Sequence, residues 1–147
     1  MPKRHLLTAV ALLVAGLFPG ARAMQAQEQG SKELAKGMFH NADKTGKGMV
    51  TIYETADGKR MLRLSNFETD KGPDLWVRFI ASDDAKDTSS VAKAAYIDVS
   101  KLNSNKGDQS YAVPESVDLA KYRVVSIWCK KFGVNFAAAP LKEAEAK

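Results

Sequence analysis

The chain has 147 residues, 45% of them hydrophobic, which is enough for one domain with a real core. Its formal charge is +5, but the first 22 residues hold three of the surplus basic side chains, so the rest carries only +2. The remaining charges alternate in sign without a basic stripe interleaved with aromatics, which argues against nucleic acid as a partner.

The first 23 residues have the three parts of a secretory signal peptide. Lys3 and Arg4 form a basic start, Leu6–Phe18 is an uncharged centre, and Ala21-Arg22-Ala23 ends the segment with small residues. A membrane anchor is the alternative, but thirteen helical residues rise only about 20 Å against a hydrocarbon core of about 30 Å. We therefore predict a signal peptide over residues 1–23, cleavage after Ala23, no membrane span in the mature chain, and a periplasmic or secreted protein.

The mature chain is predicted to be all-β. Residues 24–36 are rich in Gln, Gly and Ser and are expected to be a flexible lead-in, and residues 142–147 a frayed tail. Between them, residues 37–141 contain about eight short apolar runs separated by turn signals, which is typical of a β-sandwich or a small barrel. The expected strands are 37–40, 49–54, 60–67, 74–80, 95–99, 109–113, 123–129 and 132–137, with a helical turn near 89–93.

The second and third runs predict a hairpin whose register can be chosen from the pattern. A loop of Ala56-Asp57-Gly58 pairs Ile52 with Leu62 and Val50 with Leu64, which separates the apolar from the polar face. A two-residue loop of Asp57-Gly58 would pair Ile52 with Arg63 and would not separate the two faces. We therefore expect the longer loop, with Gly58 in the left-handed conformation.

Cys129 is the only cysteine, so it has no partner for a disulfide within its own chain. It shares a strand face with Val125 and Ile127, which is typical of a buried thiol. The next apolar run has the opposite parity, so a bend or bulge at Lys130-Lys131 is expected. That bend would bring two cationic side chains near the sulfur, and cations favour the reactive thiolate. Trp128 is the adjacent aromatic residue.

Five stretches in order resemble the DM13 domain family: Gly48–Tyr53, Leu62–Phe67, Gly72–Val77, Gly107–Pro114 and Ser126–Ala137. The most specific are the Gly-Pro-Asp-Leu, Gln-Ser-Tyr…Pro and Trp-Cys…Phe patterns. The resemblance implies a β-rich extracytoplasmic module with a role in electron transfer at the Trp-Cys site. Since members of the family can accompany haem-binding redox modules, it also implies a separate redox partner protein for this chain. Cys129 is then the candidate redox thiol or thiolate ligand, supported by Trp128, Lys130 and Lys131.

Three interpretations of Cys129 remain open from the sequence. The thiol is passive and buried, takes part in redox or ligand chemistry, or forms a disulfide with another molecule. The active interpretation includes a sulfenic acid or mixed disulfide, ligation of a haem or other metal centre, and docking against a partner's disulfide. Which cofactor would bind is not specified by the sequence.

Other candidate chemistry is sparse. His40 is the only histidine after signal cleavage, and one His with one Cys cannot form a closed zinc site, so no metal site is expected. Asp83, Asp84 and Asp87 lack the spacing of a calcium loop and are expected in a solvated loop. No nucleophile elbow, phosphate loop or dinucleotide fingerprint occurs, which argues against a classical enzyme. The competing function is a non-catalytic binding or adhesion module.

Overall fold

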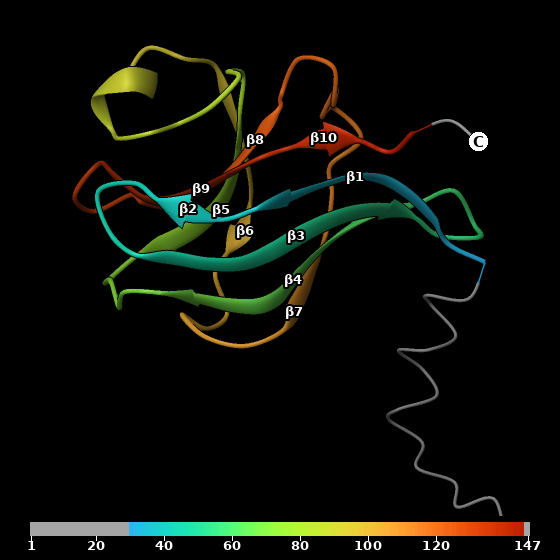
Figure 1. Ribbon diagram of the computed structural model, residues 1–147, viewed down its shortest axis with the longest axis horizontal. Coiled ribbons are helices and arrows are strands. Elements are labelled where there is room, and N and C mark those ends of the chain that lie inside the picture. The colour runs from blue at the N-terminus through green and yellow to red at the C-terminus, as the bar shows by residue number, and fades with distance from the viewer. Residues whose placement is uncertain (1–29, 146–147) are drawn as a thin grey trace, which may run out of the picture.

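The structure is a computed structural model that describes residues 30–145. The expected signal peptide and residues 24–29 of the expected lead-in lie outside this part of the chain. Within it, all regular structure is strand except for one 3-10 turn, η1 (Figure 1). The elements are β1 (Lys32–Met38), β2 (His40–Asn41), β3 (Gly46–Glu54), β4 (Arg60–Thr69), β5 (Leu75–Ile80), η1 (Ser89–Val91), β6 (Tyr96–Lys101), β7 (Gln109–Ala112), β8 (Val124–Cys129), β9 (Val134–Pro140) and β10 (Lys142–Glu143).

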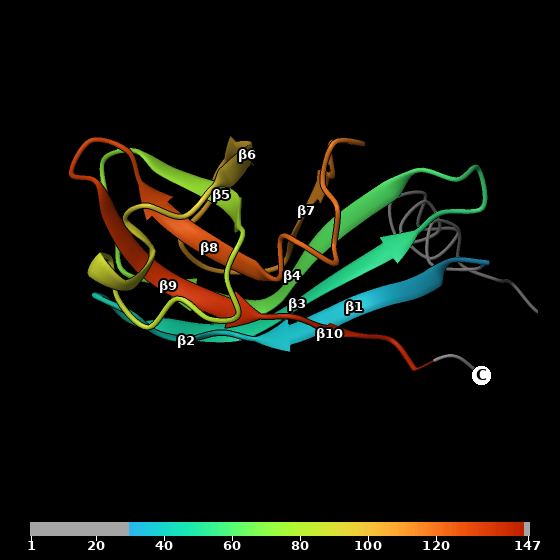
Figure 2. The ribbon, with the colours of Figure 1, turned by 90° about the horizontal axis from the view of Figure 1, so that it is seen from above.

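These strands form two antiparallel sheets of five strands, and the expected all-β sandwich is confirmed. The first sheet has the order β10-β1-β3-β4-β7 and the second β2-β9-β8-β5-β6. Figure 2 shows the two sheets lying one over the other. The chain passes from the first sheet to the second at Phe39, between β1 and β2. Contacts of β9 with β1 and β3, and of β6 with β7, bring the two sheets together on both sides of the sandwich.

The β3–β4 hairpin has the expected register. Val50 pairs with Leu64 and Ile52 with Leu62, and all four side chains are buried. Gly58 has φ +84°, the left-handed conformation that the turn requires. Because alternate residues of a strand face opposite sides, this register sends the apolar half of both strands into the core.

The inward faces of both sheets make one main core. It includes Leu62 and Leu64 from the first sheet and Val77, Phe79 and Ile127 from the second. A second, smaller apolar cluster lies on the outer face of the second sheet, where the connection between β5 and β6 covers it. Its buried members are Ile80, Ala85, Val91, Val124 and Ala138.

Strand pairing extends at both ends beyond the expected domain of residues 37–141. Residues 32–36, assigned to the flexible lead-in, form most of β1 because they pair with β3. Residues 142–143, assigned to the tail, form β10, which pairs with β1. Both segments are polar, so their own sequence gives no strand signal, and their pairing depends on an edge supplied elsewhere in the fold.

After Cys129 the set of alternate residues that faces the core changes, and a bend or bulge at Lys130-Lys131 was expected to cause this. The structure shows both a turn and a bulge, at different places. Lys130–Gly133 form a hairpin turn, with Gly133 at φ +62°, and β9 starts at Val134 rather than Phe132. The bulge lies further along: Trp128 pairs with Asn135 and Ile127 with Ala137, so Phe136 is the extra residue. Phe136 and Ala137 therefore both face the core.

Candidate functional site

Cys129 is the last residue of β8, and its side chain faces the main core. The residue is 0% exposed and belongs to the main apolar cluster. Its cross-strand neighbours are Leu75 on β5 and Val134 on β9. Leu75 also lines a hollow of about 350 Å³ beside Lys71 and Lys101. Leu75 is therefore the neighbour of Cys129 that reaches a solvent-facing hollow.

Trp128 lies on the opposite, outward face of the same strand. There it joins a set of side chains that we call the outer cluster: Trp76, Arg78, Tyr96, Asp98, Trp128 and Lys130. Trp76 and Trp128 are direct cross-strand partners on β5 and β8. Tyr96 is 53% exposed, so the cluster reaches solvent. The redox candidate and its aromatic neighbour are thus on the two sides of one strand.

Arg78 is the centre of the outer cluster and is only 5% exposed. Its guanidinium carbon lies 3.6 Å from the centre of the Tyr96 ring and 4.7 Å from that of Trp128. Its Nε donates a hydrogen bond to Asp98 Oδ1 at 2.7 Å. The rings and the carboxylate compensate for the burial of the charge, as cation–π contacts and a paired carboxylate do.

Asp98 remains ionised because two cations contact it. Burial alone would raise the pKa of the Asp98 carboxyl, but hydrogen bonds from Arg78 and Lys130 outweigh burial and lower it. The Lys130 ammonium is 3.1 Å from Asp98 Oδ2 and 3.4 Å from the centre of the Trp76 ring. The charge on Lys130 is therefore engaged on the outer face.

Lys130 and Lys131 were expected near the Cys129 sulfur, but the structure places them elsewhere. Lys130 directs its ammonium to the outer cluster, while the Cys129 side chain faces the core on the other side of the sheet. Lys131 is exposed in the hairpin turn. Of the four residues singled out in the sequence, the structure brings Trp128 and Lys130 into one cluster and separates Cys129 from it.

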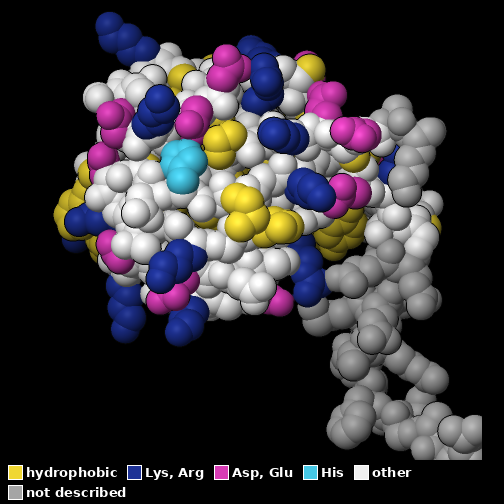
Figure 3. All heavy atoms as spheres, viewed as in Figure 1, with side chains coloured by type: hydrophobic (Ala, Val, Ile, Leu, Met, Phe, Trp, Pro, Cys, Tyr) yellow, Lys and Arg dark blue, Asp and Glu magenta, His cyan; other side chains and the backbone are white. Residues whose placement is uncertain are grey.

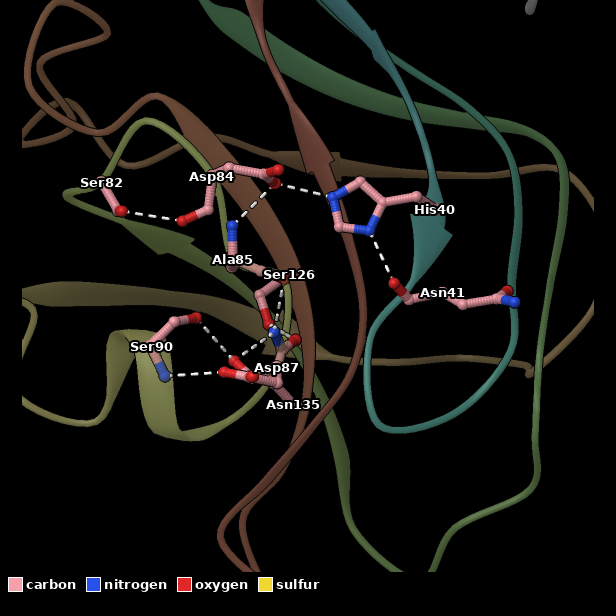
Figure 4. A network of polar contacts seen from close by, with 9 residues as sticks. All are labelled: His40, Asn41, Ser82, Asp84, Ala85, Asp87, Ser90, Ser126 and Asn135. Carbon is pink, nitrogen blue, oxygen red and sulfur yellow. Dashed lines mark hydrogen bonds and ion pairs between the residues drawn. The ribbon is translucent and has the colours of Figure 1, made fainter.

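The connection between β5 and β6, which we call the crossover (residues 81–95), is fixed to the second sheet by buried polar contacts. Asn135 is 0% exposed; its side chain accepts a hydrogen bond from Ser126 and donates to the carbonyl oxygens of Ala85 and Asp87. The small apolar cluster beneath the crossover also contacts Trp128. Figure 4 shows the polar contacts of Asn135 and also the contact between His40 and Asp84.

The His40–Asp84 pair could not be found from the sequence because 44 residues separate its members. The sequence predicts a solvated loop for Asp84 and identifies no partner for His40. The two side chains are 35% and 34% exposed, and the ring nitrogen Nε2 is 2.6 Å from Asp84 Oδ1. The His40–Asp84 contact is therefore half-buried and well defined in geometry.

Among residues 30–145 no group of three or more His, Cys, Asp and Glu side chains is placed to hold a metal ion. None of the helical structure in this range is long and apolar enough to cross a membrane. On the face seen in Figure 3, basic and acidic side chains are interspersed.

These features define a small antiparallel β-sandwich with one buried thiol beneath a cation–aromatic outer cluster. The sequence model of the family described as electron transfer DM13 matches residues 38–141. The chain belongs to this family, which links it to electron transfer and suggests a redox partner. No curated protein and no solved structure matches the chain.

Proposed function

We propose that this protein is an extracytoplasmic electron-transfer module that exchanges electrons with a separate redox partner protein, and that Cys129 carries the redox role. The observation that carries the proposal is the family match over residues 38–141, which includes the Trp128-Cys129 pair. The position of that pair supports it further, because Trp128 belongs to a cluster that reaches solvent at Tyr96.

The outer cluster is the proposed contact surface for the partner. Trp76 and Trp128 are half-buried and Tyr96 is exposed, so aromatic edges are available on a face held rigid by Arg78 and Asp98. A rigid surface of aromatic and Arg side chains is the composition that protein interfaces favour at their centres. Trp128 is the residue before Cys129 in the chain, so this surface lies one residue from the candidate redox thiol.

The burial of Cys129 limits the chemistry that its sulfur can perform. A sulfenic acid, a mixed disulfide and ligation of a haem each require the sulfur to meet a reagent directly. In the closed structure Leu75 and Val134 flank the sulfur. These reactions therefore require a local opening at this end of the sandwich.

The test is protein-film voltammetry of the full chain beside the Cys129→Ala variant. Alanine is the better variant because serine would place a hydroxyl group in an apolar site. A redox response that is present in the wild type and lost in Cys129→Ala supports the proposal. An unchanged response in Cys129→Ala would exclude Cys129 as the redox group, and Trp128→Phe then tests the outer cluster.

The burial of Cys129 specifically favours a second candidate, a non-catalytic binding or adhesion module with a passive thiol. This candidate predicts that neither protein gives a voltammetric response and that Cys129→Ala unfolds like any small core truncation. The extracytoplasmic part of the proposal has its own test. Mass spectrometry of the protein from a periplasmic or secreted fraction should show a chain that starts at Met24.

A further inference from the structure

The crossover lies over the outer face of the second sheet and contributes to the packing around Trp128. Ala85 and Val91, which it supplies, are buried against Ile80, Val124 and Ala138 of the sheet. Ala94 from the crossover and Trp128 from β8 both pack against this cluster. Any opening of the crossover would therefore loosen the apolar cluster against which Trp128 packs.

One contact that holds the crossover depends on the charge of a histidine. His40 Nδ1 lies 2.7 Å from the carbonyl oxygen of Asn41, and Nε2 lies 2.6 Å from Asp84 Oδ1. Both partners are hydrogen-bond acceptors. A neutral imidazole has a single N–H and can donate to only one of them, whereas the imidazolium donates to both. The observed geometry is thus that of protonated His40 (Figure 4).

We infer that the His40–Asp84 contact is a pH-sensitive latch, which holds the crossover over Trp128 while His40 is protonated and loosens it when His40 loses its proton. The latch acts beside contacts that do not involve His40. Asn135 holds Ala85 and Asp87, and Asp43 accepts a hydrogen bond from the Thr88 amide. Deprotonation therefore increases local opening without releasing the whole segment.

The surrounding charges agree with this direction. Burial lowers the pKa of His40, but hydrogen bonds to Asn41 and Asp84 and the Asp84 charge outweigh it, so the pKa is raised above 6.5 despite the opposing charge of Lys86. On the neighbouring strand the cross-strand partner is the neutral Ala138. The pKa of Asp84 is lowered: burial opposes this, and hydrogen bonds from His40 and the Ala85 amide cause it.

The sign of the effect follows from these directions. His40 contributes its full stabilisation below pH 6.5 and loses it as the pH rises through its raised pKa. Asp84 contributes fully above pH 3.8 and loses its part only as the pH falls through its lowered pKa. The latch is therefore closed in mildly acidic solution and loosens in alkaline solution. Only the idea that the latch controls electron exchange at Trp128 rests on the proposed function. The pH dependence of the latch does not rest on it.

Hydrogen exchange of the full chain tests the latch without any redox measurement. Between pH 6 and pH 9 we expect the protection factors of the Thr88 and Asn135 amides, corrected for intrinsic exchange, to fall roughly threefold, in keeping with a half-exposed ion pair. The fall should vanish in His40→Gln and in Asp84→Asn. Asp83→Asn is the matched control, because Asp83 pairs with Arg123 instead and its loss should leave the pH dependence intact.

A second readout follows Trp128 directly. In a Trp76→Phe background, acrylamide quenching of the remaining tryptophan should increase with pH, and adding His40→Gln should abolish that increase. A wild type without pH dependence, or a dependence that persists in both latch variants, would overturn the inference. If the latch responds as expected while voltammetry shows no current, the proposed function fails and the latch stands.

Discussion

The burial of Cys129 makes a quantitative prediction about its reactivity. An alkylating reagent can reach a sulfur that is 0% exposed only when the protein opens. If the opening costs about 5 kcal/mol, the lower end of typical domain stability, the folded protein should react roughly 4,000-fold more slowly than the unfolded chain. The assay is the rate of iodoacetamide modification with and without denaturant, followed by mass spectrometry.

Leu75→Ala shows whether the sulfur is reached locally or only by global unfolding. Leu75 flanks Cys129 and lines the adjacent hollow, so its truncation removes cover between the sulfur and that hollow. A Leu→Ala cavity costs about 3 kcal/mol, which by itself would accelerate modification roughly 150-fold. Local access should add to this increase.

Leu62→Ala is the matched control, because Leu62 is fully buried in the opposite sheet. After correction for the measured unfolding free energy of each variant, Leu75→Ala should react faster than Leu62→Ala. Equal corrected modification rates in the two variants would show that Leu75 does not shield the sulfur locally. A wild type whose folded thiol reacts within about tenfold of the unfolded thiol would refute the argument from burial altogether.

Other predictions concern the polar side chains of the second sheet and two glycines of the first sheet. Asn135→Ala should cost about 2–4 kcal/mol in urea unfolding, because Ser126 and the carbonyl oxygen of Ala85 lose a buried partner and the carbonyl oxygen of Asp87 loses a part-buried one. A cost below about 0.5 kcal/mol would contradict this. Arg78→Lys keeps the charge but loses the planar contact with two rings, and should cost about 1–2 kcal/mol and shift the tryptophan emission. The lowered pKa of Asp98 predicts stability that is present above pH 3.8 and lost as the pH falls through that pKa; Asp98→Asn should remove this part of the acid unfolding curve. Gly37→Ala would place a Cβ atom 2.1 Å from the Pro140 carbonyl oxygen and should cost about 3 kcal/mol, whereas Gly58→Ala meets no neighbour and should cost only about 1 kcal/mol of backbone strain.

Local patterning predicted the parts of the fold that depend on neighbouring residues. The β3–β4 register followed from separating apolar from polar side chains across a short turn, and the strand face of Cys129 followed from its alternation with Val125 and Ile127. Both are determined within a few residues of chain. The family could also be recognised, because its patterns are short and lie in a fixed order.

Features that depend on distant segments could not be predicted in this way. A bend or bulge was expected at Lys130-Lys131, where the parity changes in the sequence. The structure has a hairpin turn there and also a bulge at Phe136, because the pairing of β9 with β8 decides which residue is left over. The engagement of Lys130 by Asp98 joins strands that are remote in the sequence. Polar β1 and β10 residues became strands for the same reason, since each takes an edge that the other parts of the fold provide.

The pairing of β10 with β1 has a practical consequence for how this domain can be joined to others. Ala35 lies opposite Glu143 and Lys36 opposite Lys142, so the two ends of the folded unit leave from the same edge of the first sheet (Figure 1). Adjacent ends favour circular permutation and insertion into a host protein. A fusion at either end would extend from the first sheet, while the outer cluster belongs to the second sheet. The domain can therefore be tethered or immobilised at either end through the sheet that does not carry that cluster.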